Sequence, residues 1–259
     1  MEPSRAPFES GWEWFKQGAG LFFAQPMMLI LIHVLYIIVM LFIQFIPFIG
    51  MFAAYLITPA LLAGILYATH RIAQRDEIEA GFLFQVFNDK SKLHPMLTLG
   101  GLYMVSVIII MMVVFAIMFA VAGPLFFELL MAEPEAAREL FEDNIEVVFV
   151  MMGAMLVSGF IMMALLLMGF FYAIPLVMFS TTEPFDAIKS SIRACWRNMW
   201  PLTLFGVLHI FFVFIGSLPL LLGLFIVMPI TFAAWYASFR EIYPDVDEEE
   251  PSTPGVMHV

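Results

Sequence analysis

Six long apolar stretches constrain what this chain can fold into. They lie at about residues 27–46, 51–69, 96–121, 147–172, 202–217 and 220–239. Each is close to the roughly 20 residues that an α-helix needs to cross a hydrocarbon core about 30 Å thick. The chain is 63% hydrophobic and 13% charged, whereas soluble domains are roughly half apolar and about a quarter charged. The sequence therefore predicts an all-α, polytopic membrane protein with six transmembrane helices.

Short connections between the stretches predict how they pair. Only residues 47–50 separate the first two stretches, and only Leu218 and Pro219 separate the last two. We expect each such pair to form an antiparallel helical hairpin, and the six spans to form three hairpins. Together they are predicted to build a single membrane domain, residues 1–245. An acidic tail, residues 246–259, is expected to be disordered because it cannot bury enough apolar surface to fold.

An amphipathic segment precedes each predicted hairpin. The first begins with the pattern Ser10-x-x-Glu13, which is typical of a capping box, and ends before Pro26 because proline disfavours helix in the preceding residue. The second is the short apolar stretch 82–87, in a loop that we expect to end at His94-Pro95. The third covers 183–200. We expect all three to be helices that lie in the cytoplasmic membrane interface.

The three units of amphipathic helix and hairpin resemble one another, and we interpret them as a pseudo-repeat. A proline opens the first span of each unit, at Pro26, Pro95 and Pro201. His33 falls seven residues after Pro26, and His209 falls eight residues after Pro201. Each unit begins on the same side, so the repeats are parallel, unlike the inverted repeats of many transporters. Because prolines flank helices in many proteins, chance matching is the alternative explanation.

The charged residues predict an orientation. With the N-terminus inside, ten of the eleven Lys and Arg residues fall on the cytoplasmic side and only Arg138 falls outside, which is a strong positive-inside pattern. Both termini are therefore expected in the cytoplasm. The net charge of −11 comes from the segment 122–146 and the acidic tail, so nothing indicates nucleic-acid binding. No cleavable signal peptide is expected, because the first 26 residues lack its charge and hydropathy pattern.

Several short motifs carry a resemblance to known proteins. They are Gly11-Trp12-x-Trp14, Leu21-Phe22-x-x-x-Pro26, Ile46-Pro47-x-Ile49-Gly50, Pro59-x-x-x-Ala63-Gly64, Leu83-Phe84, Leu99-Gly100, Ala187-x-x-x-Ser191 and Asn198-x-x-Pro201. With these motifs the chain resembles an uncharacterised family of bacterial six-span integral inner-membrane proteins. The last two are also distantly similar to the membrane domain attached to some glycerophosphodiesterases. The resemblance implies six spans in a bacterial inner (plasma) membrane, and it implies neither phosphodiesterase activity nor any site residues.

Few residues offer chemistry inside the predicted spans. His33 and His209 lie at matching depths in spans one and five, and facing each other they could form an intramembrane polar site that binds a metal or relays protons. The alternative is that each is a neutral histidine bonded to a neighbouring helix. Paired methionines are better explained by apolar packing than by copper binding. Cys195 lies near Arg193 and Arg197, which could lower its pKa, but a packed interfacial cysteine is the expected case. We expect no catalytic residues, no metal and no cofactor.

Lys189, Arg193 and Arg197 stand four residues apart on the third amphipathic segment, for which Thr182 is the expected N-cap. This basic stripe is expected to contact anionic lipid head groups, at about 1 kcal/mol per charge. The alternative is that the stripe only sets orientation. Another face is apolar, and it is predicted from residues that share helical spacing: Phe185, Ile188, Ile192, Cys195, Trp196 and Met199.

Two functions fit these features. The first is a non-enzymatic, lipid-interacting or accessory membrane module that acts as a scaffold, with membrane lipids and a membrane-protein partner or a second copy of the chain as partners. The alternative is a small transporter or channel with a path between the pseudo-repeats, near the prolines Pro59 and Pro229. A transport path usually exposes polar groups at mid-depth, and the shortage of such groups favours the first function.

Overall fold

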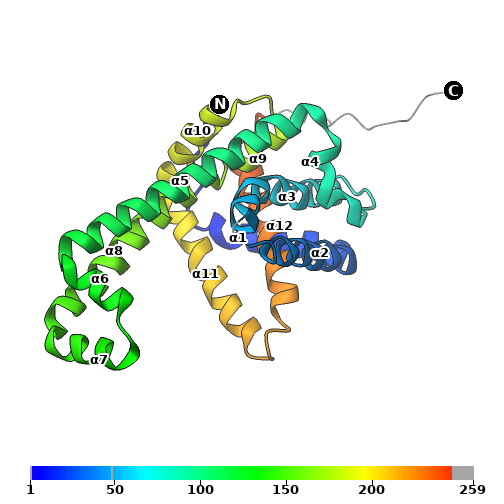
Figure 1. Ribbon diagram of the computed structural model, residues 1–259. Helices are drawn as coiled ribbons and strands as arrows, with labels where there is room; N and C mark the ends of the chain where they lie inside the picture. Colours follow the sequence, from blue (N-terminus) through cyan, green and yellow to red (C-terminus); the bar gives the residue numbers. More distant parts are fainter. Residues whose placement is uncertain (1, 48, 247–259) are drawn as a thin grey trace. The chain divides into compact units, whose positions relative to one another are not determined.

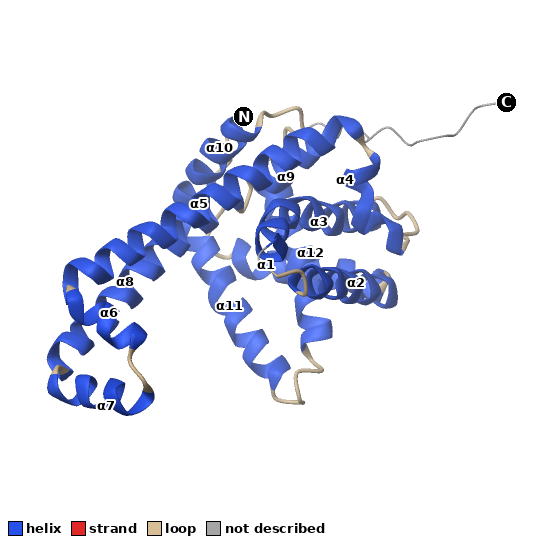
Figure 2. Ribbon diagram, viewed as in Figure 1, coloured by secondary structure: helices blue, strands red, loops and turns tan. Residues whose placement is uncertain are grey.

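The computed structural model describes residues 2–47 and 49–246, and every regular element in this part of the chain is helical (Figure 2). In order, these elements are α1 (Ser10–Ala24), α2 (Pro26–Gln44), α3 (Ile49–Ala73), η1 (Ala80–Phe84), α4 (Gln85–Asn88), α5 (Lys90–Ala122), α6 (Pro124–Met131), α7 (Pro134–Asp143), α8 (Ile145–Phe170), α9 (Ala173–Phe179), α10 (Pro184–Arg197), α11 (Met199–Ser217) and α12 (Leu224–Ile242) (Figure 1). They form two compact units. The first unit comprises Met1–Leu102 with Met168–Val259, and the second unit comprises Tyr103–Leu167.

Five helical segments of the described chain are long and apolar enough to cross a membrane. They are Pro26–Gln44, Ile49–Ala73, Lys90–Ala122, Ile145–Phe179 and Met199–Ser217. These confirm the all-helical, membrane-type fold and correspond to the first five predicted spans. The sixth predicted span is also helical, but α12 is not among the five, since Arg240 and Glu241 in its last turns lower its hydropathy.

Two predicted helix starts were wrong, each for a local reason. The last helix begins at Leu224 rather than Leu220, because Leu220 and Leu221 have positive φ angles of 52° and 66°, which a helix cannot accommodate. The third span begins at Lys90, with Pro95 inside the helix. Asp89 starts it: its Oδ1 atom accepts hydrogen bonds from the Ser91 backbone N–H (2.9 Å) and hydroxyl (2.6 Å).

The first amphipathic helix, α1, is part of the core of the first unit. Its side chains Trp14 and Phe15 are buried against α11 and α12. A Cβ atom on Gly18 would lie 2.5 Å from the Ala234 backbone nitrogen of α12, so only glycine permits this close approach. One face of α1 is therefore occupied by the protein, and the expectation that the helix lies in the membrane interface stays a prediction.

The predicted capping box at the start of α1 is also wrong. Its N-cap residue is Glu9, which makes no capping side-chain bond. The Ser10 hydroxyl instead donates to Glu241 Oε1 (2.7 Å), and the Trp14 indole donates to Glu241 Oε2 (2.6 Å). Glu13 pairs with Lys16 at 2.6 Å. Of the two residues expected to cap α1, Ser10 therefore contributes to its attachment to α12, whereas Glu13 pairs within α1.

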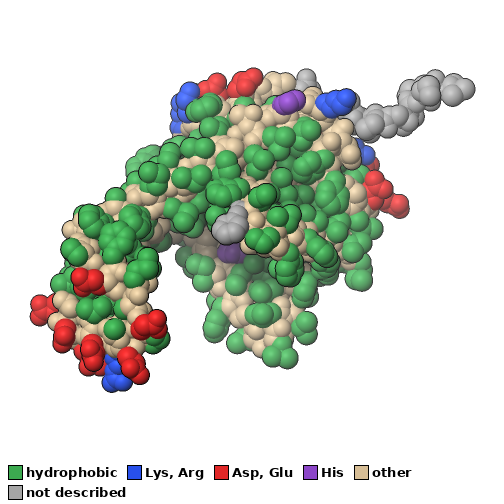
Figure 3. Space-filling model, viewed as in Figure 1, with side chains coloured by type: hydrophobic (Ala, Val, Ile, Leu, Met, Phe, Trp, Pro, Cys, Tyr) green, Lys and Arg blue, Asp and Glu red, His purple; other side chains and the backbone are tan. Residues whose placement is uncertain are grey.

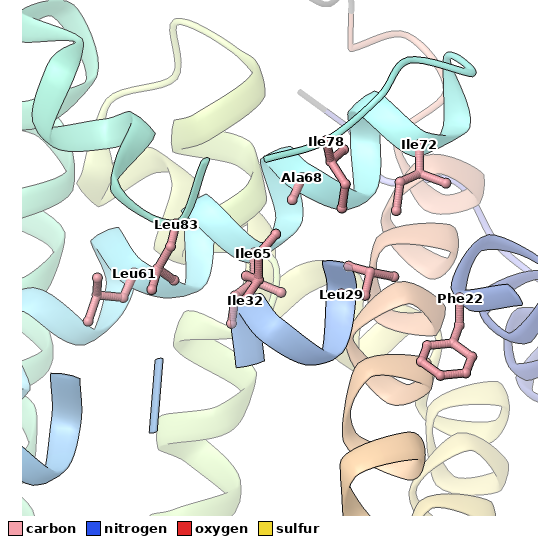
Figure 4. Packing of buried hydrophobic residues seen from close by; sticks show 9 residues of the cluster. All are labelled: Phe22, Leu29, Ile32, Leu61, Ile65, Ala68, Ile72, Ile78 and Leu83. Atoms are coloured by element: carbon pink, nitrogen blue, oxygen red, sulfur yellow. The ribbon is translucent and has the colours of Figure 1, made fainter. Parts of the chain in front are cut away.

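The packing of α2 on α3 forms the hydrophobic cluster drawn in Figure 4. Leu29 and Ile32 of α2 face Ile65 of α3, and all three are fully buried. The small residues Ala60, Gly64 and Ala68 of α3 are buried too, and the backbone of Leu83 in η1 lies directly against Gly64. Small residues here allow the close approach that their spacing predicted. The second amphipathic segment is thus a short 3₁₀ turn and helix packed on α3.

In the second unit, the acidic segment 122–146 contains two short helices. They are α6 and α7, and their N1 residues are Pro124 and Pro134. The aromatic ring of Phe127 packs against Phe115 and Phe119 of α5. Figure 3 shows acidic side chains gathered over α6 and α7. This rim is exposed and solvated, in accordance with its composition.

The boundaries proposed for the domain and its tail are only partly covered by the described residues. Val246, at the start of the predicted tail, is buried and accepts a hydrogen bond from the Arg240 guanidinium (3.3 Å). The remainder of the tail, 247–259, lies outside the described residues. The single domain 1–245 stays a prediction.

Candidate functional site

The third amphipathic helix, α10, presents a mixed basic and apolar surface. Lys189, Arg193 and Arg197 are all exposed. Lys189 forms an ion pair with Asp186 (3.0 Å), in which both side chains are about two-thirds exposed, so this pair adds little to stability. Around the helix, the side chains of Phe185 and Trp196 are 61% and 69% exposed. The stripe predicted from the sequence is thus free to meet an external partner.

The apolar face predicted for α10 is not the face that packs on the protein. The buried side consists of small residues, namely Ala187, Ser190, Ser191, Ala194 and Cys195 with Pro184 at the start. Large apolar residues of the predicted face, including Phe185, Ile192, Trp196 and Met199, are exposed. Small residues let helices approach closely in membrane proteins, and large apolar ones can face lipid. These exposed apolar side chains agree with the expectation that α10 lies in the membrane interface, which stays a prediction.

Ser191 fastens α10 to the break between α8 and α9. Its hydroxyl donates to the Met168 carbonyl oxygen (2.7 Å) and accepts from the Tyr172 backbone N–H (2.9 Å). These bonds satisfy backbone groups that the helix break leaves free. The N-cap of α10 is Glu183 and not Thr182, whose hydroxyl bonds to that of Ser180 instead (2.7 Å). Ser191, from the motif Ala187-x-x-x-Ser191, thus has a structural role.

Asn198 clamps the N-terminal segment of the chain. Its Oδ1 atom accepts from the Ala6 backbone N–H (2.8 Å), and its Nδ2 group donates to the carbonyl oxygens of Ser4 (2.9 Å) and Ala194 (3.0 Å). The Ser4 N–H in turn donates to the Ile242 carbonyl oxygen at the end of α12 (2.8 Å). The Asn198 side chain is fully buried. We name this arrangement, Asn198 with Ser4 and Ala6, the N-terminal clamp.

The clamp places Arg5 beside Arg197 at a surface pocket of about 410 Å³. Its wall contains Arg5, Pro7, Phe8, Arg197, Trp200 and Pro201. Arg197 belongs to the predicted stripe, whereas Arg5 was expected only as one of the ten Lys and Arg residues on the cytoplasmic side. Sequence reasoning missed Arg5 because nothing local indicates that a residue near the N-terminus lies against the end of α10. The pattern Asn198-x-x-Pro201 was the available signal.

The two predicted histidines both contact α12, but in the described chain they do not contact each other. His33 Nδ1 lies 2.7 Å from the Leu29 carbonyl oxygen of its own helix, and its ring lies beside Phe232. His209 Nδ1 lies 3.2 Å from the Thr231 hydroxyl. His33 Nε2 is buried and has no hydrogen-bond partner among the described residues. No group of three or more metal-ligating side chains occurs in this part of the chain.

Cys195 is a buried thiol, not an activated one. Burial raises its pKa to about 12, and the hydrogen bond with Ser191 only partly offsets this effect. The expected packed cysteine is confirmed, and the alternative of a thiol activated by Arg193 and Arg197 is not, because both arginines are on the exposed side of α10. At neutral pH the nucleophilic thiolate is therefore scarcely populated.

One known protein is similar over most of the chain. A probable inner membrane protein of Burkholderia thailandensis is 26% identical over 202 residues, which cover 77% of this chain and 72% of that protein. No family model and no solved structure matches the chain. With the five membrane-capable helices, this similarity decides the class. The chain is a membrane protein with transmembrane helices. The similarity supports the expected inner-membrane family and does not show the link to glycerophosphodiesterases.

Proposed function

We propose that this chain is a non-enzymatic protein of the bacterial inner membrane that binds anionic lipids through the exposed side of α10, as a lipid-interacting or accessory module. The observation that carries the proposal is the arrangement of that helix. Its small residues fasten it to the first unit, and its exposed side combines the basic stripe with Phe185, Ile192 and Trp196. The membrane interface is the environment that suits both the basic and the apolar side chains of this surface.

The membrane interface satisfies both halves of the exposed side of α10. Exposed aromatic and aliphatic side chains are favourable among acyl chains and lipid glycerol groups, where Trp is enriched. Lys and Arg can extend from there to lipid phosphates while their aliphatic stems stay in apolar surroundings. Each basic residue near an anionic leaflet contributes about 1 kcal/mol. In water, the same side of α10 would expose Phe185 and Trp196 without compensation.

The proposal includes six spans in three hairpins, with both termini in the cytoplasm. Two packing pairs support it, α2 with α3 and α11 with α12. All basic residues except Arg138 belong to the first unit, and Figure 3 shows the visible ones gathered at the end of that unit that holds α10 and α4. We infer that this end faces the cytoplasm and that α12 is the sixth span.

A shared arrangement of a side-chain amide supports the similarity of the first and third pseudo-repeats. Gln25, directly before α2, donates to the Asp76 carbonyl oxygen (2.6 Å) and accepts from the Ile78 N–H (3.1 Å). Asn198, directly before α11, binds Ser4 and Ala6 in the same way. In both cases a side-chain amide ahead of a span holds two backbone groups of a non-helical segment. The second of the three pseudo-repeats has no amide in this position, since Asp89 precedes α5.

The test compares two triple variants of equal charge. Lys189, Arg193 and Arg197 are changed to Gln in one, and the exposed residues Lys16, Arg75 and Lys90 are changed to Gln in the other. Native mass spectrometry after purification in mild detergent counts the anionic lipids that accompany each protein. We expect several-fold less lipid with the first variant and little change with the control. Equal lipid content in both variants and the wild type would refute the proposal.

Buried His33 favours the transporter or channel as a second candidate. A polar atom that is buried without a partner costs free energy, so the unpartnered Nε2 atom is consistent with a site for a proton or solute. Proton or solute flux into proteoliposomes that His33→Leu abolishes would support this candidate. An absence of flux with the wild-type protein under a proton gradient and a range of solutes would count against it.

A further inference from the structure

The two guanidinium groups at the N-terminal clamp come from opposite ends of the chain. Arg5 lies between Ser4 and Ala6, and Asn198 holds the backbone on both sides of it. Arg197 is the residue next to Asn198. Because a fully buried side chain fixes this arrangement, both arginines meet at one pocket as a built feature of the fold, and not by the chance position of a mobile terminus.

Within the described part of the chain, both charges at this pocket lack a protein partner. Among the described residues, no hydrogen bond or ion pair involves the Arg5 or Arg197 guanidinium, and no carboxylate belongs to the residues that line the pocket. Two like charges brought together are unfavourable unless an anion joins them. Guanidinium groups bind phosphate in a bidentate manner, which gives directionality as well as charge. The pocket therefore has the chemistry of a phosphate site.

The remaining wall of the pocket is apolar and lies where a membrane-capable helix begins. Trp200 is 70% exposed and Phe8 is 51% exposed, and Pro7 and Pro201 complete the rim. Trp200 and Pro201 occupy the first turn of α11, a candidate membrane span. The ends of spans lie at head-group depth, where Trp is enriched. A soluble anion would use the arginines alone, whereas a phospholipid would use the aromatic rim as well.

We propose that this pocket binds the phosphate of an anionic phospholipid between Arg5 and Arg197, with the upper part of the acyl chains against Trp200 and Phe8. The volume of about 410 Å³ is in the range of small-molecule sites, roughly 300–1,000 Å³. The proposal rests on the proposed function, because it requires α10 to lie at the membrane interface. It adds a discrete site, formed by a residue outside the stripe.

The experiment measures phosphatidylglycerol binding by the full-length protein in detergent, for Arg5→Gln, for Arg197→Gln and for both together. Each single variant is expected to lose about five- to tenfold in affinity. The double variant is expected to lose less than the product of the two, because one phosphate joins both groups. Arg5→Lys is expected to recover only part of the affinity, since lysine keeps the charge but not the bidentate geometry. The control is Lys16→Gln, an exposed cation on α1, which should bind as the wild type does.

Soluble competitors and a stripe variant separate the outcomes. Inorganic phosphate and glycerol phosphate are expected to compete weakly, and competition at the affinity of the lipid would overturn the lipid assignment. Lys189→Gln with Arg193→Gln leaves both pocket arginines in place. If this variant weakens binding and Arg5→Gln does not, the pocket is refuted and the proposed function stands. If neither weakens binding, both are refuted.

Discussion

Asn198 is a residue whose environment explains more than its sequence position does. A buried amide with three hydrogen bonds loses all of them on truncation, and the backbone groups of Ser4 and Ala6 lose their partner. We predict that Asn198→Ala lowers the free energy of unfolding by about 1–3 kcal/mol. Thermal unfolding in detergent measures the loss. Asn144→Ala is the control, because Asn144 makes one bond within its own stretch of chain (3.1 Å) and should cost less.

Cys195 yields a prediction about reactivity. With its pKa raised to about 12, the thiol should alkylate with iodoacetamide far more slowly at pH 8 than an exposed cysteine. Thr181→Cys in a Cys195→Ala background supplies that exposed reference, since Thr181 is exposed. The raised pKa also stabilises the folded protein below the ordinary thiol pKa, and this contribution is lost as pH rises toward 12. Equal alkylation rates at the two positions would contradict the buried-thiol assignment.

At the scale of single residues, the sequence indicated which side chains could matter but not which residues they contact. The pattern Asn198-x-x-Pro201 was visible, but its ligands Ser4 and Ala6 lie at the other end of the chain, beyond any local signal. Arg5 was missed for the same reason. His33 and His209 were expected at matching depths in their spans, and the structure shows both against α12 but not in contact with each other in the described chain. Whether either has a function stays a prediction.

At the scale of elements, helix α1 offers a matched pair of glycines. A Cβ atom on Gly18 would collide with the α12 backbone at 2.5 Å, whereas one on Gly20 has open space within 4 Å. We predict that Gly18→Ala destabilises the protein by about 1–3 kcal/mol through overpacking. Gly20→Ala should be neutral or stabilising by up to about 1 kcal/mol, because alanine favours helix. Melting temperatures in detergent report both, and similar values for the two variants would contradict the packing of α1 on α12.

Helix existence was predictable from length and hydropathy, whereas helix ends and faces were not. Apolar length alone identifies α2, α3 and α11, because no other element satisfies the backbone across a membrane. The start of α5 depended on the Asp89 cap, and the start of α12 on two leucines with positive φ. For α10 the sequence identified the basic stripe and the large apolar face, but not the side of small residues that packs on the protein. Periodicity finds the apolar face without saying what it contacts.

At the scale of the whole molecule, the charge asymmetry predicts a topology. A green fluorescent protein fusion at the C-terminus should fluoresce, since the fluorophore matures in the cytoplasm. An alkaline phosphatase fusion in α7, near Glu135, should be active because that segment is expected outside. The expectation follows from ten basic residues on one side against Arg138 on the other. A non-fluorescent C-terminal fusion with an inactive phosphatase fusion would indicate the reverse orientation. A non-fluorescent C-terminal fusion with an active phosphatase fusion would put both positions on the same side of the membrane and remove α12 as the sixth span.

The N-terminal clamp also has a consequence for the order of events during synthesis. Residues 4–6 leave the ribosome well before Asn198, which follows Ala6 by 192 positions, and before Ile242. At about 5–20 residues per second, the N-terminal segment waits on the order of ten to forty seconds for its partner. Membrane insertion of the earlier helices must therefore proceed while this segment is unattached. The clamp can close only after Asn198 has been made, so a nascent chain arrested before Asn198 should leave residues 4–6 open to protease.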